Sequence, residues 1–258
     1  MVEITTRGRI AAVAASPDEL TRAQYARALA LSVSLATGAV TPDAARRRLM
    51  SMLIGMDDYG ALLPEHVAEI DAQLGALDDF FATAPDGSVS MPLDSVANLL
   101  PETDGFSGPG DWLEGVSFGE FTECQAVLGA LAEGQADPEE IAGAYAHVAR
   151  TLYRIPEESE VPDILLVHAP RLFMAVWNRI CSEPVEINGR RIDFRIIFAP
   201  SGPKRPDDGT GWTGITFEVA SAGIFGDTLG VEGTDFWSVL LYLYKCKFEY
   251  INDKNRNS

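Results

Sequence analysis

Residues 137–154 read DPEEIAGAYAHVARTLYR, and this stretch predicts a helix with one apolar face. Asp137 can cap the free N–H groups at a helix start, and Pro138 fits the first helical position. The acidic pair that follows, Glu139 and Glu140, suits the positive end of the helix dipole. Apolar residues then recur at helical spacing, at Ile141, Tyr145, Val148 and Leu152.

Start signals of the same kind recur along the chain. They are Ser16-Pro17-Asp18-Glu19, Thr41-Pro42-Asp43 and the capping-box pattern Ser117-Phe118-Gly119-Glu120. We expect helices to follow them as far as Leu35, Ile54 and Leu131. Further predicted helices cover 64–81, 94–100, 170–181 and 235–251. Residues 215–224 fit either a strand or a helix, and their alanine-rich end favours a helix. The end of 235–251 also fits a strand.

One segment has the period of a β-hairpin instead. Residues 185–196 alternate apolar and polar side chains around Asn188-Gly189, a pair that tolerates the positive φ angles of a type I′ turn. An isolated hairpin is marginal in water, so we expect its apolar face to pack on helices. The predicted fold class is mainly α (α+β), a multi-helix bundle with one antiparallel β-hairpin at residues 185–197.

The chain is long enough for one large domain or two small ones. Residues 82–115 are rich in turn signals, and Gly108-Pro109-Gly110 is the densest of them. We therefore predict an N-terminal helical domain, 1–107, and a C-terminal helical domain with the hairpin, 108–258.

The charge balance limits the partners. With 38 acidic and 20 basic residues the net charge is −18, which opposes direct binding to nucleic acid or to an anionic membrane. Residues 111–163 hold most of the imbalance, and their acidity is typical of solvated helices. The alternative is an acidic surface with a binding role, including mimicry of nucleic acid by a regulatory protein.

The expected location is the cytoplasm. The apolar run 10–15 is too short for a signal peptide, and no stretch approaches the roughly 20 apolar residues that span a bilayer. Three cysteines at long spacings, Cys124, Cys181 and Cys246, favour a reducing compartment and core packing.

The sequence offers weak signals for catalysis. Gly209-Thr210-Gly211-Trp212-Thr213-Gly214 matches the glycine spacing of a dinucleotide-binding loop, but a polar loop precedes it where a strand is required. A nucleotide-binding or small-molecule enzyme using this loop is therefore the alternative function. None of the three histidines, His66, His147 and His168, has the spacing of a metal site. We assign no catalytic, cofactor-binding or metal-ligating residue and expect no enzyme activity.

Basic side chains near the hairpin could meet an acidic protein partner. Arg46-Arg47-Arg48 lies among acids and is typical of a salt-bridged helix surface. The residues that we predict to bind a partner are Arg190, Arg191, Lys204, Arg205 and Trp212.

Several stretches from about residue 100 onward resemble proteins encoded in the tail regions of temperate phages and prophages of gut anaerobic bacteria. They are residues 108–115 (GPGDWLEG), 118–121 (FGEF), 211–220 (GWTGITFEVA) and 241–250 (LYLYKCKFEY). The resemblance implies a non-enzymatic role in phage tail assembly, structural or chaperone-like. It also implies partners among phage or host proteins, and a location in the cytoplasm or on the virion. It carries over no catalytic residues.

Overall fold

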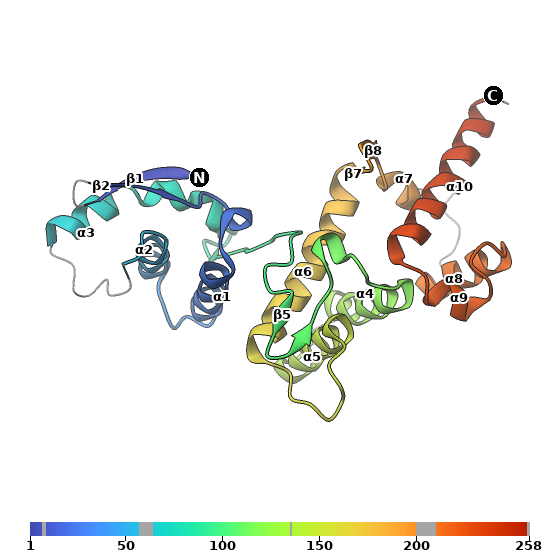
Figure 1. The fold of residues 1–258 in the computed structure, drawn as a ribbon, viewed down its shortest axis with the longest axis horizontal. Coiled ribbons are helices and arrows are strands. Elements are labelled where there is room, and N and C mark those ends of the chain that lie inside the picture. Colours follow the sequence, from blue (N-terminus) through green and yellow to red (C-terminus); the bar gives the residue numbers. More distant parts are fainter. Residues whose placement is uncertain (7–8, 57–63, 135, 200–209, 257–258) are drawn as a thin grey trace. The chain divides into compact units, whose positions relative to one another are not determined.

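The computed structural model describes residues 1–6, 9–56, 64–134, 136–199 and 210–256. Two compact units make up the chain, Met1–Leu100 and Pro101–Ser258. Both are mainly helical and both carry small antiparallel hairpins, which confirms the predicted fold class (Figure 1). The predicted boundary after residue 107 falls inside the second unit, just past the β5–β6 hairpin (Glu102–Thr103 and Phe106–Ser107).

The first unit begins with a hairpin and continues with helices. Its elements are β1 (Val2–Thr6), β2 (Arg9–Val13), η1 (Pro17–Glu19), α1 (Arg22–Ala36), α2 (Pro42–Leu53), α3 (Pro64–Asp71), η3 (Leu74–Phe80), β3 (Ala82–Thr83) and β4 (Val89–Ser90). The N-terminal hairpin was not predicted. It pairs Val2 with Val13 and Thr6 with Arg9, and it buries Ile4 and Val13.

Two predicted helices of the first unit are wrong in their bounds. Pro17 opens only a short 3-10 turn, because Leu20 is extended and buried, and α1 starts instead at a capping box between Thr21 and Gln24. The predicted helix 64–81 is interrupted at Gln73. The Thr5 N–H donates to Gln73 Oε1 at 2.8 Å, and Gln73 Nε2 donates to the Thr5 carbonyl at 2.7 Å. These two hydrogen bonds hold Gln73 against β1, and the helix is interrupted at this position.

The predicted short helix 94–100 is also absent from the structure. The Asn98 side chain accepts a hydrogen bond from the Leu100 N–H, and the Ser95 hydroxyl accepts one from the Ala97 N–H. Local side-chain bonds of this kind compete with a helix for the backbone donors.

The basic run on α2 is largely paired within the first unit. Arg47 makes a two-pronged ion pair with Asp71, at 2.8 and 2.9 Å. Arg46 pairs with Asp78 at 2.7 Å and lies 4.5 Å from the centre of the Phe81 ring. The predicted salt-bridged helix surface is therefore confirmed for two of the three arginines.

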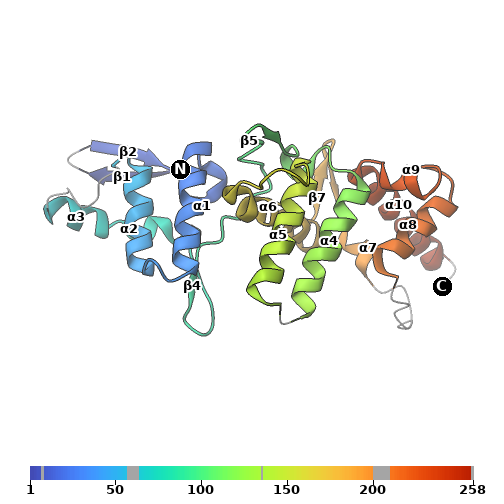
Figure 2. The same ribbon diagram turned by 90° about the horizontal axis from the view of Figure 1, so that it is seen from below.

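The second unit packs helices around an aromatic core. After β5 and β6 come η4 (Asp111–Leu113), α4 (Phe118–Glu133), α5 (Pro138–Tyr153), α6 (Asp163–Ser182), β7 (Val185–Ile187), β8 (Arg190–Ile192), α7 (Arg195–Phe198), α8 (Gly211–Ser221), α9 (Thr228–Glu232) and α10 (Phe236–Arg256). Helices α4 and α5 lie side by side (Figure 2).

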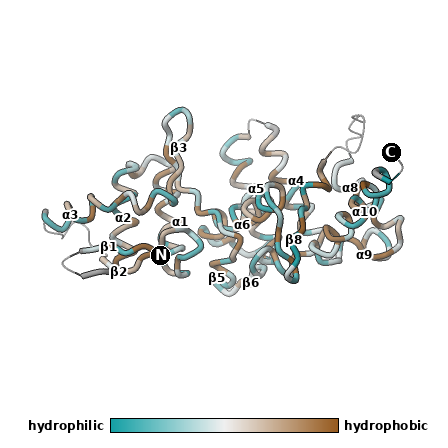
Figure 3. The backbone as a smooth tube through the Cα atoms, turned by 90° about the horizontal axis from the view of Figure 1, so that it is seen from above, coloured by the Kyte–Doolittle hydropathy of each residue, from teal (hydrophilic) through white to brown (hydrophobic). Residues whose placement is uncertain are grey.

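Apolar stretches run through the elements of both units (Figure 3). No helix among the described residues is long and apolar enough to cross a membrane.

The helix starts at α4 and α5 are as predicted. Ser117 and Glu120 form one capping box, and Asp137 and Glu140 form another. Helix α6 begins earlier than predicted, at Asp163, and carries Pro170 inside it. Residues 215–221 belong to a helix, α8, rather than to a strand.

The predicted hairpin is present but shorter than expected. Asn188 and Gly189 have φ angles of 51° and 73°, as a type I′ turn requires, and Val185 pairs with Ile192. Strand β8 ends at Ile192. The Asp193 carboxylate accepts hydrogen bonds from the Arg195 N–H, at 3.1 Å, and from the Arg195 guanidinium, and these bonds turn the chain into α7. Phe194 is buried at that corner.

Phe121 lies at the centre of the second core. Its ring centroid is 5.0 to 5.5 Å from those of Phe173, Trp177, Trp212 and Phe236. The cluster joins α4, α6, α8 and the start of α10. Two of the four tryptophans of the chain, Trp177 and Trp212, belong to this cluster. The other two extend it, since Trp237 contacts Phe236 and Trp112 contacts Trp237.

Candidate functional site

The predicted partner-binding residues have separate environments. Arg190 and Arg191 are exposed on β8, where Arg191 stands opposite Glu186. Trp212 is half-buried and packs edge-on against Phe118 and Phe121. This packing explains Trp212 without any partner, so its binding role stays a prediction. Lys204 and Arg205 lie outside the described residues.

The glycine pattern sits at the first turn of α8. Gly211 opens the helix, and a Cβ added at Gly214 would lie 2.2 Å from Thr210 Oγ1. Gly209 lies outside the described residues. The sheets that the described residues form are two-stranded antiparallel hairpins. A strand–loop–helix unit of a parallel sheet, which a dinucleotide loop needs, is not formed by them.

The buried titratable groups belong to the core. His168 is 1% exposed, and its ring packs edge-on against Tyr153. Burial, with a smaller effect of Arg171, lowers the pKa of His168 to about 4. Burial also raises the pKa of the Cys124 thiol to about 12, so this thiol is a poor nucleophile at neutral pH. No group of three or more metal-ligating side chains occurs within the described ranges.

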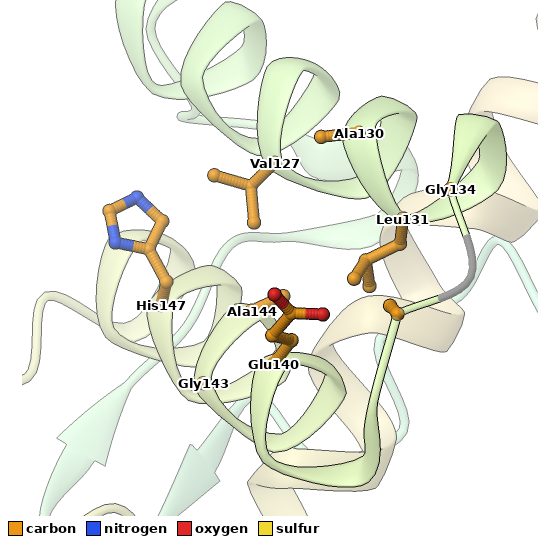
Figure 4. Close-up of a pocket in the computed structure, with 9 residues that line it drawn as sticks. Val127, Ala130, Leu131, Gly134, Glu140, Gly143, Ala144 and His147 are labelled. Carbon is orange, nitrogen blue, oxygen red and sulfur yellow. The ribbon is translucent and has the colours of Figure 1, made fainter.

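An open groove lies between α4 and α5 in the described part of the chain. It is an open hollow of about 700 Å³. Figure 4 shows side chains of the two helices facing each other across it, with Val127 and Leu131 on one wall and Glu140 and His147 on the other. The residues that line it, hereafter the α4–α5 groove, are Val127, Ala130, Leu131, Gly134, Ala136, Glu140, Gly143, Ala144 and His147.

Helix α4 supplies the apolar wall. It contains no lysine or arginine, and between Ala126 and Ala132 every exposed or half-exposed position is apolar. Val127 and Leu131 are half-buried, whereas Ala130 is exposed. A helix that is apolar on all sides is normally covered on all sides. One side of residues 126–132 of α4 therefore lacks the cover that their composition calls for.

The two ends of the groove are acidic. Glu123 Oε1 lies 2.8 Å from His147 Nε2 at one end, and both side chains are substantially exposed. At the other end Glu140 accepts a hydrogen bond from the Asp137 N–H, and Asp137 caps α5. No lysine or arginine lines the groove.

A second hollow of about 580 Å³ lies beside the same helix pair. Leu128, Ile141 and Tyr145 contribute to it, as does Met174 of α6, which is 37% exposed. Leu131, Gly134 and Ala136 line both hollows. The ends of α4 and α5 near residue 134 are thus incompletely packed on two sides.

Sequence reasoning missed the α4–α5 groove. The available signal is the presence of small residues on two successive predicted helices, Ala130 and Gly134 four residues apart at the end of one and the neighbours Gly143 and Ala144 on the other. Small residues of this kind allow a further helix to approach closely.

Comparison with known proteins does not identify the chain. No protein-family model matches it, and no curated protein or solved structure matches it either. Two features bear on function: the geometry of the α4–α5 groove, and the resemblance to phage tail-region proteins of residues 108–115, 118–121, 211–220 and 241–250.

Proposed function

We propose that this protein is a non-enzymatic component of phage tail assembly, acting as a chaperone-like or structural protein through protein–protein contacts. The observation that carries this proposal is the uncovered apolar side of α4 in the α4–α5 groove. An apolar surface that a folded protein leaves open is typical of a site where another protein binds.

The resemblance to phage tail-region proteins supports the same proposal. Stretches that carry it meet in the second unit, where Trp212 packs against Phe118 and Phe121. Two of the quoted stretches, 118–121 and 211–220, thus contribute to one core, which is expected if the resemblance extends to a folded domain. The proposed partners are phage or host proteins.

A genetic experiment tests the proposal. A stop codon early in this reading frame, in the prophage that carries it, should yield heads without normal tails after induction. Electron microscopy of the lysate is the measurement, and supplying the intact gene from a plasmid should restore tails. Normal tails in the mutant lysate would refute the role in assembly.

A further inference from the structure

We propose that the α4–α5 groove binds an amphipathic helix of a partner protein, with an apolar face flanked by lysine or arginine side chains. This inference rests on the proposed function, since it names the chemistry of the partner. Three properties of the groove carry it: its length and shape, its apolar walls and its charge.

The shape of the groove fits a helix. On the α4 side its lining runs from Val127 to Gly134, and Glu123 lies one turn before Val127. The eleven residue steps from Glu123 to Gly134 correspond to about 16 Å, or roughly three helical turns. Ala130, Gly143 and Ala144 line it with little side-chain bulk. Two helices pack at axis separations of about 8–10 Å, and small residues at the contact favour the closer end of that range.

The charge of the groove selects a cationic partner. Glu123 and Glu140 stand at its two ends, and the start of α5 adds Asp137 and Glu139. The first arginine of α5, Arg150, lies in its last turn and donates to the Pro156 and Ser159 carbonyls. A helix with basic flanks would place positive charge at both acidic ends, and this complementarity also speeds encounter.

Other occupants fit the groove less well. A second copy that presented the same groove would bring acidic ends against acidic ends, since symmetric dimers pair identical surfaces. An added β-strand has no strand edge to pair with, because the walls are helices whose N–H and C=O groups are bonded internally.

The first experiment uses a synthetic peptide. A peptide about three heptads long, with leucine at the a and d positions and lysine elsewhere, has the proposed chemistry. Its control has the same composition, with the leucines redistributed so that no helical face is apolar. Isothermal titration calorimetry on the full-length protein should give the amphipathic peptide at least about tenfold higher affinity than its control. Equal affinities would overturn the proposal, because they would mean that charge alone attracts the peptide.

Two matched pairs of variants locate the binding. A Cβ added at Gly143 or at Gly129 meets no heavy atom within 4 Å, so the two helix positions are matched in their room for a Cβ. Gly143 lines the groove and Gly129 does not. Gly143→Leu should weaken peptide binding about tenfold, whereas Gly129→Leu should leave it nearly unchanged. Circular dichroism checks that both variants fold.

The charge pair gives an independent readout if Gly143→Leu fails to fold. Glu123→Lys and Glu218→Lys change the net charge equally, but Glu218 lies on α8 and is not among the residues that line the groove. Only Glu123→Lys should weaken the affinity for the peptide severalfold. Added salt should reduce the difference in affinity between Glu123→Lys and the wild type. Equal effects of the two substitutions would overturn the proposal. A dimer that sedimentation detects and Gly143→Leu abolishes would also overturn it, because a second copy would then be the occupant.

The peptide experiment and the genetic one can fail separately. Tailless particles without selective peptide binding would leave the assembly role standing and remove the basic helix as the partner. Selective binding with normal tails would show a helix-binding protein that acts elsewhere.

Discussion

Acid should destabilise the second unit partly through the buried His168. The substitution His168→Gln should therefore reduce the loss of unfolding free energy that this unit shows when the pH is lowered. His168 is 1% exposed on α6, and burial, with a smaller effect of Arg171, lowers its pKa to about 4. In an unfolded chain an imidazole has a pKa of about 6.5. Between these two values the unfolded chain binds a proton that the folded chain excludes, so acid favours unfolding there.

The sign and the size of the effect follow from this linkage. Above about pH 6.5 both states are neutral at His168, and the favourable burial of the neutral ring is fully present. As the pH falls from about 6.5 to about 4 that contribution is lost, at about 1.4 kcal/mol per pKa unit, or roughly 3 kcal/mol in total. Between about pH 7.5 and about pH 5 the loss should reach about 2 kcal/mol.

The assay compares wild type with His168→Gln by urea unfolding, followed by circular dichroism at the two pH values. Carboxylates also titrate in this range, but they do so in both proteins and cancel in the difference. Wild type should lose about 2 kcal/mol more than the variant. Equal losses would contradict the reasoning, as would an NMR titration in which folded His168 gains its proton near pH 6.5.

Further predictions concern packing, caps and thiol reactivity. Gly143→Ala should raise the free energy of unfolding by about 0.5–1 kcal/mol, because it removes backbone freedom from a helix interior with open space for the methyl group; thermal unfolding measures it, and a lowered midpoint would contradict the α5 geometry. Asp137→Ala should cost about 1 kcal/mol in urea unfolding, since it leaves the Glu139 and Glu140 N–H groups without their acceptor; an unchanged midpoint would mean that the cap is dispensable. Phe121→Ala should cost about 3–5 kcal/mol, because Phe121 lies at the centre of the aromatic cluster; a cost below about 1 kcal/mol would be incompatible with that position. Cys124 should resist iodoacetamide at pH 8 until urea unfolds the second unit, and mass spectrometry of early labelling at this residue would disprove its burial.

Most signals that act within one turn of helix can be read from the sequence, although Ser16 makes no cap bond and Pro17 opens only a 3-10 turn. The capping residues Thr41, Ser117 and Asp137 all begin helices where they were expected to. Each signal involves a side chain and a backbone N–H two or three residues away, so no tertiary information is needed. The turn at Asn188-Gly189 is local in the same way.

Features that depend on contacts distant in sequence could not be read. The break at Gln73 exists because Thr5 lies beside it in space, 68 residues earlier in the chain. The sequence predicts a helix start at Pro170, but Pro170 lies inside α6, where it is buried. The groove was missed because its walls are unremarkable helices singly and form a site only where the two meet.

The placement of the tryptophans determines what an optical experiment on this protein can see. Trp112, Trp177, Trp212 and Trp237 all belong to the second unit, so indole emission follows that half of the chain and is blind to the other. A single sigmoidal emission curve would therefore be compatible with a first unit that has already melted. The substitution Phe81→Trp would introduce an indole beneath the Arg46 guanidinium and give that unit a fluorophore of its own.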